Sequence, residues 1–351
     1  MSLRRSRLLL APAATSAFTL MALSVALGDV VTLNPDATTK GVGGAVRGVV
    51  QAESSTVVEV KLGNTVTKVP TNEVASITYD GHPASLDQAN DKLAANDLAA
   101  AAELFKKAAG EASTKPFIAE DALFSQARTV AEMALTDTSK AEEAVALLDA
   151  FTRAHKSGRH AAPALEALAR LQIAQEDYAG VEKTLSQLGQ FPKGEDRAAI
   201  FKVKVFAKKG QLDQAIAELD KIIAAAPEKS EKRRDALLTK AESLAAQKKY
   251  AEAESTVRAV IKDAPTEDAA TQAAAYNTLG DCLRAAGKPK EALYAYLHTD
   301  LLFGKAKNEH ARALSQISQL WRVLKREDRA EEAKERLKQE YPRSTYANAM
   351  K

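Results

Sequence analysis

The feature that most constrains this chain is a helical pattern that repeats from about residue 82 to the end. Small residues recur at the spacing at which the two helices of a hairpin would cross, and larger apolar residues recur around them. The clearest unit has Leu279, Gly280 and Leu283 before a turn at Gly287, and Ala292 after it. One such hairpin cannot bury its apolar face alone, so the pattern predicts hairpins stacked in a row.

Seven units can be aligned on this plan, with successive spacings of 34 to 43 residues. Their small residues include Ala215, Ala241 and Ala253. The offsets resemble those of tetratricopeptide repeats, whose standard length is about 34 residues, with longer turns between units. The tail Tyr341–Ala347 resembles repeats of bacterial envelope proteins. The resemblance implies a mainly α fold over residues 82–351, an α-α superhelical solenoid of about seven hairpins.

Residues 29–81 have a different composition, rich in Val, Thr and Gly, and alternate in the manner of strands. Val58, Val60 and Leu62 fall on one predicted face, and Gly63-Asn64 is a two-residue hairpin signal. Five short strands are predicted: Val30–Leu33, Val46–Val50, Val58–Leu62, Val66–Val69 and Ala75–Tyr79. The pattern is typical of a small SH3-like barrel or a compact meander.

The first 28 residues are predicted to be a signal peptide. Arg4, Arg5 and Arg7 form a basic start, an apolar stretch follows from Leu8 to Leu27, and Ala26-Leu27-Gly28 suits a cleavage site. The alternative is an uncleaved membrane anchor, because the apolar stretch is about long enough to span a bilayer. Either way, we expect the bulk of the protein to be exported to the periplasm or cell envelope.

The net charge excludes one class of partner. The leader holds three arginines and no acids, so the remaining chain has 49 − 3 = 46 basic residues against 46 acidic ones. A neutral chain lacks the broad positive field that nucleic-acid binding requires. We therefore expect no nucleic-acid partner, and membrane contact only through an uncleaved leader.

No residue pattern predicts catalysis, a cofactor or a metal. His155 and His160 are five residues apart without a cysteine or paired acid nearby, whereas zinc sites use three or four such ligands. Gly41-x-Gly43-Gly44 lacks the lysine and helix of a phosphate-binding loop. The single cysteine, Cys282, and the single tryptophan, Trp321, are expected in the core, although Trp321 could instead anchor a partner. The chain is not expected to be an enzyme; the remaining alternative is an active site formed between repeats.

The resemblance implies that partners bind on the concave face, which the first helix of each hairpin lines. The candidate groove residues in this register are Arg170, Lys204, Lys208, Glu242, Asp281, Arg284 and Arg322. Arg170 with Lys204 can hold a carboxylate or an acidic peptide, unless this is an ordinary solvated helix face. Glu242 and Asp281 interrupt the positive stripe.

Two functions follow from these patterns. The first is a non-catalytic protein–protein interaction scaffold of the bacterial periplasm or cell envelope, which binds a protein or peptide in the groove. The alternative is a structural envelope protein, whose β module contacts wall or surface polymer while the repeats serve as a spacer.

Overall fold

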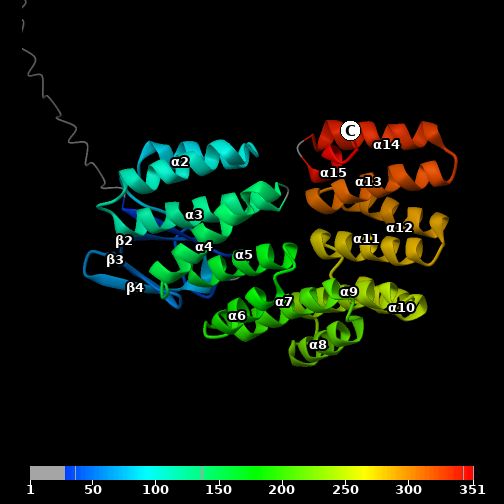
Figure 1. Cartoon of the computed structure of the whole chain (residues 1–351), viewed down its shortest axis with the longest axis horizontal. Helices are drawn as coiled ribbons and strands as arrows, with labels where there is room; N and C mark the ends of the chain where they lie inside the picture. Colours follow the sequence, from blue (N-terminus) through cyan, green and yellow to red (C-terminus); the bar gives the residue numbers. More distant parts are fainter. Residues whose placement is uncertain (1–27, 36, 136, 343, 351) are drawn as a thin grey trace, which may run out of the picture.

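The computed structural model describes residues 28–35, 37–135, 137–342 and 344–350, and its strands precede its helices (Figure 1). Apart from Gly28, the predicted signal peptide lies outside the described residues. Within the described ranges, no helix combines the length and apolarity that crossing a membrane requires.

A five-stranded antiparallel sheet forms the first part of the structure, as predicted. Its strands are β1 (Asp29–Leu33), β2 (Ala45–Glu53), β3 (Val57–Leu62), β4 (Thr65–Pro70) and β5 (Val74–Thr78). The order in the sheet is β4-β3-β2-β1-β5. The first four strands run as a meander, and β5 returns beside β1 through a 3-10 turn, η1 (Thr71–Glu73). This order agrees with the predicted SH3-like sheet.

The hairpin turn between β3 and β4 is Gly63-Asn64, as predicted, and Gly63 has φ +61°. Val58 and Val60 are buried, in agreement with the predicted apolar face. Leu62 was expected on that face too, and this is wrong: its side chain is 67% exposed. Leu62 is the last residue of β3, beside the turn.

The sheet shares an apolar core with the first helices. One cluster of buried side chains joins Val31 and Val60 from the sheet to Phe105 and Ile118 from the helices. Phe105 is only 1% exposed, although it comes from a helix. The sheet therefore covers the face that the first hairpin would otherwise expose to water.

Fourteen long helices follow the sheet and pair into the seven predicted hairpins. They are α1 (Ala84–Ala94), α2 (Leu98–Glu111), α3 (Pro116–Ala134), α4 (Ala141–Ala154), α5 (Ala161–Ala174), α6 (Tyr178–Leu188), α7 (Gly194–Lys208), α8 (Leu212–Ala225), α9 (Glu231–Ala246), α10 (Tyr250–Asp263), α11 (Ala269–Ala285), α12 (Pro289–Leu302), α13 (Lys307–Val323) and α14 (Glu327–Glu340). A 3-10 turn, η2 (Thr138–Lys140), precedes α4, and a short helix, α15 (Thr345–Asn348), follows α14.

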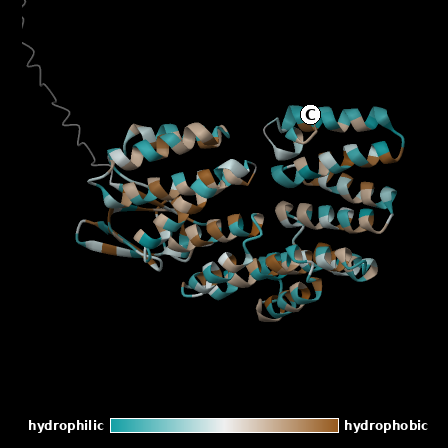
Figure 2. Ribbon diagram, viewed as in Figure 1, coloured by the Kyte–Doolittle hydropathy of each residue, from teal (hydrophilic) through white to brown (hydrophobic). Residues whose placement is uncertain are grey.

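The stacked hairpins form a curved array. In Figure 1 the array bends into a U, with α2–α5 in one arm, α6–α10 along the base and α11–α15 in the other arm. Along each helix, hydrophobic and hydrophilic residues interleave, as expected for helices that bury one face against their neighbours (Figure 2). The predicted superhelical solenoid is confirmed.

The turn inside a hairpin has the same construction in six of the seven hairpins. In each, one residue just after the first helix has a positive φ: Asn96, Glu176, Gly210, Lys248, Gly287 and Lys325. The next residue then donates its backbone N–H to a carbonyl five residues earlier, as from Lys249 to Leu244 at 2.9 Å. This is the Schellman arrangement, which satisfies the last carbonyl groups of a helix.

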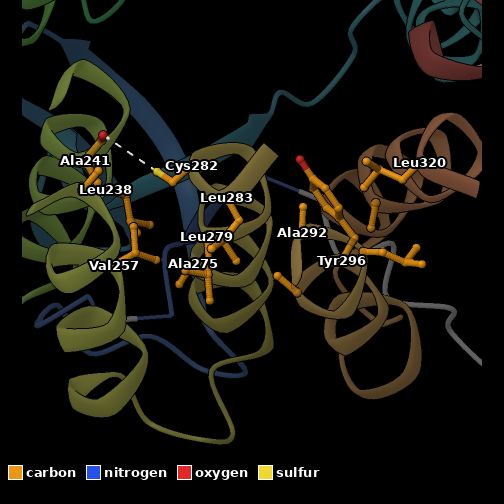
Figure 3. Close-up of a cluster of buried hydrophobic side chains, with 14 of the residues drawn as sticks. Leu238, Ala241, Val257, Ala275, Leu279, Cys282, Leu283, Ala292, Tyr296 and Leu320 are labelled. Atoms are coloured by element: carbon orange, nitrogen blue, oxygen red, sulfur yellow. Dashed lines mark hydrogen bonds between the residues drawn. The ribbon is translucent and has the colours of Figure 1, made fainter. Parts of the chain in front are cut away.

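Small residues lie where the helices cross, as the repeat pattern predicts. Ala253 and Ala292 are fully buried. A Cβ atom on Gly280 would lie 2.6 Å from the ring of Tyr296, so a larger residue would force that ring to move. Tyr296 and Ala292 lie together in the buried cluster that Figure 3 shows. Cys282 is buried in the same cluster, and burial raises the pKa of its thiol to about 12. Trp321 packs half-buried against this cluster, as predicted.

Candidate functional site

The predicted groove residues all lie on the first helices of hairpins three to seven. They are Arg170 on α5, Lys204 and Lys208 on α7, Glu242 on α9, Asp281 and Arg284 on α11, and Arg322 on α13. Asp281 is half-buried and the other six are exposed. We call this surface the first-helix face. Its charges separate into a cationic half and an acidic half.

The cationic half is formed by α3, α5 and α7. Burial lowers the pKa of Lys204, and the nearby charge of Arg170 lowers it further, so these two cations are close. Arg128 on α3, which the repeat register did not select, lines the same hollow as Arg170. Within the part of the chain that the structure describes, none of the three forms an ion pair. Their positive charge is therefore available to a partner.

The acidic half is formed by α9, α11 and α13, where one arginine lies between two carboxylates. Arg312 on α13 pairs with Asp281, and its Nη2 lies 3.9 Å from Glu242 Oε1. Tyr296 donates its hydroxyl to Asp281 at 2.6 Å. Burial raises the pKa of the Glu242 carboxyl, the charges of Asp281 and Glu309 add to this, and Arg312 opposes it. The structure thus brings Glu242 and Asp281 together.

Arg312 was missed because the positions considered all lie in the second half of each first helix, whereas Arg312 lies in the first half of α13. The first turns of α13, and not its middle, lie beside Asp281. Arg322 was expected in the groove, but its Nη2 lies 2.5 Å from Glu331 in the second helix of its own hairpin. Arg284 approaches Asp281 at 3.8 Å. Lys208 joins neither half.

A cavity of about 400 Å³ lies between the two halves. It is lined by Ile200, Val203, Lys204, Leu219, Ile222, Glu231, Lys232, Asp235, Ala236 and Thr239, from α7, α8 and α9. We call it the α7–α9 pocket. The backbones of consecutive first helices pack against each other from α3 to α7 and from α9 to α13, whereas those of α7 and α9 lie further apart. Side chains still join these two helices, because Lys232 pairs with Asp196 at 2.8 Å and Val203 and Ala236 share a buried cluster. The wider spacing of the backbones leaves Ile200 44% exposed at the pocket.

The wall of the α7–α9 pocket is apolar and its edges carry opposite charges. Lys204 is on the α7 edge and Asp235 on the α9 edge. Burial raises the pKa of the Asp235 carboxyl, and the neighbouring Glu231 charge adds to this. An apolar pocket with a few polar groups around it is the usual form of a specific binding site.

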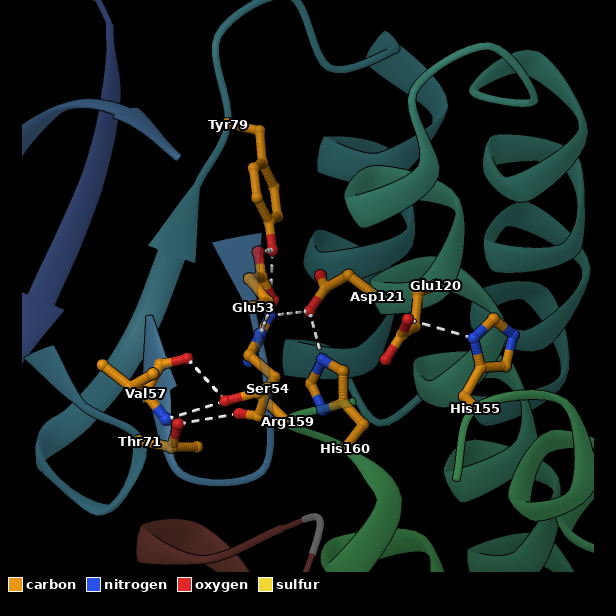
Figure 4. Close-up of polar contacts among 10 residues, drawn as sticks. All are labelled: Glu53, Ser54, Val57, Thr71, Tyr79, Glu120, Asp121, His155, Arg159 and His160. Carbon is orange, nitrogen blue, oxygen red and sulfur yellow. Dashed lines mark hydrogen bonds and ion pairs between the residues drawn. The ribbon is translucent and has the colours of Figure 1, made fainter. Parts of the chain in front are cut away.

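A second polar cluster joins the sheet to the array (Figure 4). Arg159, in the loop between α4 and α5, donates from Nε to Glu53 at 2.7 Å and pairs with Asp121. His160 Nε2 lies 2.9 Å from Asp121, and the Tyr79 hydroxyl donates to Glu53. The side chains of Arg159 and Glu53 are 11% and 6% exposed. We call these five residues the junction cluster.

The residues of the junction cluster shift one another's pKa values. Burial alone would raise the pKa of Asp121, but the hydrogen bond from His160 and the charge of Arg159 outweigh it, so this pKa is lowered. Burial lowers the pKa of His160, which favours its neutral form. His155 Nδ1 lies 3.0 Å from Glu120. Among the described residues, no three His, Cys, Asp or Glu side chains are grouped so that they could hold a metal ion.

Two overlapping segments, residues 202–268 and 238–298, match the family model of the tetratricopeptide repeat. The chain contains tetratricopeptide repeats. The matched repeats run from within α7 to α12, so they include both edges of the α7–α9 pocket and two carboxylates of the acidic half, Glu242 and Asp281.

Several solved structures resemble the chain at low sequence identity. A tetratricopeptide repeat protein from Parabacteroides merdae is 15% identical, over 76% of this chain and 96% of that one, with a TM-score of 0.49. PilW, a type IV pilus biogenesis factor, is 14% identical over 64% and 96%, with a TM-score of 0.42. A Rap protein in complex with competence and sporulation factor is 14% identical over 76% and 78%, with a TM-score of 0.46. None of these likenesses carries a functional argument, and no curated protein matches the chain.

Proposed function

We propose that this protein is a non-catalytic scaffold of the bacterial periplasm or cell envelope, which binds a protein partner on the first-helix face of its tetratricopeptide repeats. The observation that carries the proposal is the α7–α9 pocket, an apolar cavity with Lys204, which forms no ion pair among the described residues, at its edge. Repeat arrays of this kind use their concave face to bind extended partners.

The pocket suits one large apolar side chain of a partner. Its volume of about 400 Å³ and its wall of Val203, Leu219, Ile222 and Ala236 match the size and character of such sites. Binding energy at protein interfaces is concentrated in a few anchors of this type, in well-packed pockets near the centre of the interface. We therefore expect an aromatic or aliphatic anchor in the partner.

The charges on the two sides of the α7–α9 pocket favour one orientation of a bound peptide along the first-helix face. Towards α3, the unpaired cations Arg128, Arg170 and Lys204 favour acidic residues through charge-assisted hydrogen bonds. Towards α13, Arg312 is already occupied by Asp281 and Glu242. The fitting partner is an extended peptide with an apolar anchor and acidic residues on one side of it.

Binding of designed peptides tests this function. The probes are fluorescent peptides with one Phe flanked by two Glu on its N-terminal or C-terminal side, and the same peptides with Lys in place of Glu. We expect one Glu order to bind in fluorescence anisotropy. Arg170→Ala and Lys204→Ala should each weaken it about ten-fold, since a charged hydrogen bond is worth roughly 1.5–3 kcal/mol, and should flatten its salt dependence.

Two further variants make the test specific. Thr239→Trp fills the α7–α9 pocket and should abolish binding of the Phe anchor. Lys202→Ala removes one charge from another face of α7, where Lys202 lines a different hollow, and should leave binding unchanged. Equal losses in Lys202→Ala and Lys204→Ala, or no binding of either Glu peptide, would contradict the proposal.

Export rests on the predicted leader and has its own test. The full chain, fused at its C-terminus to a reporter that is active only outside the cytoplasm, should give an active reporter in bacteria. Removal of residues 1–28 should abolish that activity while the protein still accumulates. An active reporter without the leader would refute this part of the proposal.

A further inference from the structure

A second cavity, of about 520 Å³, lies where the sheet meets the array. We call it the junction cavity. The sheet side is lined by Asn34, Ser55, Thr56, Thr71, Asn72 and Val74. The array side is lined by Arg159, His160, Ala162, Pro163, Phe191, Pro192, Lys193 and Arg197. None of the candidate groove residues lines it, so it is separate from the first-helix face.

The array side of the junction cavity is cationic. Arg159, Lys193 and Arg197 line the cavity together with His160, and the lining contains no carboxylate. Arg159 is balanced by the junction cluster, and Arg197 lies 3.1 Å from Glu166. Lys193 forms no ion pair within the described ranges. Lys193 is therefore the one cation of this lining that no carboxylate among the described residues compensates.

The backbone at Lys193 is held in an uncommon conformation. Its φ of +55° and ψ of +17° are left-handed, directly before the first residue of α7. Non-glycine residues adopt this region rarely, and unlike Asn96, Glu176, Lys248 and Lys325, Lys193 does not lie in the turn inside a hairpin. Here the conformation accompanies a position on the cavity wall.

The sheet side of the junction cavity is neutral and polar, and its loops are fixed by hydrogen bonds. The Thr71 hydroxyl donates to the Ser54 carbonyl at 2.8 Å, and the Asn34 amide donates to the Asn72 carbonyl at 2.9 Å. The Ser55 backbone N–H donates to the Ser157 carbonyl at 2.8 Å, which ties this wall to the array. The Ser55 hydroxyl and the Asn72 side-chain amide have no hydrogen-bond partner among the described residues.

We propose that the junction cavity binds an anionic sugar, a hydroxylated ring that carries a carboxylate or a phosphate. The cations on one side supply charge-assisted bonds for the anion. The hydroxyl and amide groups of Ser55 and Asn72 on the other side can both donate and accept, as ring hydroxyls require. Phe191 and Pro163 supply apolar contact for the carbon skeleton, and the volume lies within the range of small-molecule sites.

Titration calorimetry with defined probes tests the assignment on the chain from residue 29 onward. Glucuronate carries a carboxylate and glucose 6-phosphate a phosphate on similar rings, so the pair distinguishes the two anions. Glucose lacks the charge and inorganic phosphate lacks the ring. We expect at least one anionic sugar to bind, and to bind at least ten-fold more tightly than both glucose and inorganic phosphate.

Two substitutions test whether the sugar binds in the junction cavity. Lys193→Asn keeps a residue that tolerates the left-handed backbone, and Arg197→Gln removes the charge but keeps a polar side chain. Each should weaken the bound sugar about ten-fold, the loss expected for one charged hydrogen bond. Lys202→Gln, on another face of α7, should not. The melting temperature of each variant verifies that it folds. If Arg197→Gln does not fold, the sugar affinity of Lys193→Asn alone decides whether the site is in this cavity.

Several results would overturn the proposal. They are no binding of either anionic sugar at millimolar concentration, inorganic phosphate or glucose binding as tightly as the sugar anion, and equal losses in Lys193→Asn and Lys202→Gln. Because the peptide test uses different residues, failure here leaves the proposed function standing, and failure there leaves this site standing.

Discussion

Single residues with left-handed backbone fix the turns of the hairpins. At two of these turns the position is occupied by glycine, Gly210 and Gly287, and at two others by lysine, Lys248 and Lys325. Glycine adopts this conformation without a steric penalty, whereas residues with a Cβ atom pay roughly 1–2 kcal/mol. The lysines are therefore tolerated at some cost to stability.

Replacing Lys248 with glycine should stabilise the protein. We expect Lys248→Gly to raise the free energy of unfolding by about 0.5–1 kcal/mol, because the strain exceeds the backbone entropy that glycine adds to the unfolded chain. Urea denaturation measures the change. Lys249→Gly, at φ −84°, removes the same side chain from the next residue and should stabilise nothing. Equal shifts in both variants would show that backbone conformation is not the cause.

The buried carboxylate of Asp300 makes stability depend on pH. Burial alone would raise its pKa, but His310 Nε2 at 2.8 Å and the Arg336 guanidinium at 2.9 Å outweigh this and lower the pKa to about 2. A carboxyl whose pKa is lower in the folded than in the unfolded state stabilises above the unfolded value, near 4, and this stabilisation is lost as the pH falls towards 2.

Asp300→Asn should remove this dependence. At pH 7 we expect a loss of roughly 2 kcal/mol or more, since a shift of one unit corresponds to about 1.4 kcal/mol and the Arg336 guanidinium loses its anionic partner. The difference between variant and wild type should shrink between pH 4 and pH 2, which urea denaturation across that range measures. A difference that stays constant with pH would assign the loss to packing instead.

These two residue-scale features differ in how far the sequence predicts them. The glycine at Gly287 is marked as a turn by the repeat alignment. The partners of Asp300 lie 10 and 36 residues away in the chain, and nothing in the local pattern indicates that they meet. Contacts of that kind depend on how one hairpin is seated on the next.

At the scale of elements, periodicity predicts the helices and strands because each buries one face. Gly280 and Ala253 stood out as small residues in a helical pattern, and the structure places both at crossings. Leu62 shows the limit: alternation assigned it to the buried face, but coverage of a strand end depends on what packs over it. Arg312 shows a second limit of prediction from sequence. The shift of one helix along its neighbour decides which turn of α13 faces Asp281, and the sequence pattern does not give that shift.

Overpacking a crossing should destabilise the array. Gly280→Ala brings a Cβ against the buried Tyr296 ring, and Ala253→Leu and Ala292→Leu add larger groups at other crossings. We expect each to cost roughly 1–3 kcal/mol in urea denaturation. Gly110→Ala is the control: its Cβ meets nothing within 4 Å, so it should be neutral or stabilising. If Gly280→Ala and Gly110→Ala had the same free energy of unfolding, the helix crossing at Gly280 would have room for a methyl group.

At the scale of the whole molecule, the sheet and the array depend on each other. Their shared apolar core and the junction cluster tie residues more than 100 positions apart, such as Glu53 and Arg159. The sequence showed two regions of different composition but not that they share a core. The junction cavity could not be predicted either, because its lining comes from loops of both regions and is assembled only by their packing.

Breaking the junction cluster should destabilise the molecule strongly. Arg159→Ala leaves the carboxylates of Glu53 and Asp121 buried without their cation, which costs about 3–5 kcal/mol. Arg258→Ala is a matched control, because Arg258 is 59% exposed and pairs with Glu254 one helical turn away. Exposed pairs of this kind contribute about 0.3–0.5 kcal/mol. Similar losses in the two variants, by urea denaturation, would mean that the junction cluster is not a buried ion pair in solution.

Removing the sheet should expose the first hairpin. Without residues 29–80, Phe105 and Ile118 lose their apolar cover. We expect the truncated chain to bind a hydrophobic dye and to lose helical circular dichroism from its first hairpins, since a terminal repeat needs a covered outer face. A truncated array with unchanged helicity and no dye binding would show that the hairpins are stable without the sheet.

The wider spacing between the backbones of α7 and α9 has a mechanical consequence. It lies at the base of the U, so a small change in the spacing of these two helices is a rotation of one arm relative to the other, and the displacement grows with distance from the base (Figure 1). A partner side chain bound between α7 and α9 would fix the angle between the two arms. A side chain of a different size would fix a different angle, and therefore a different distance between the ends of the arms.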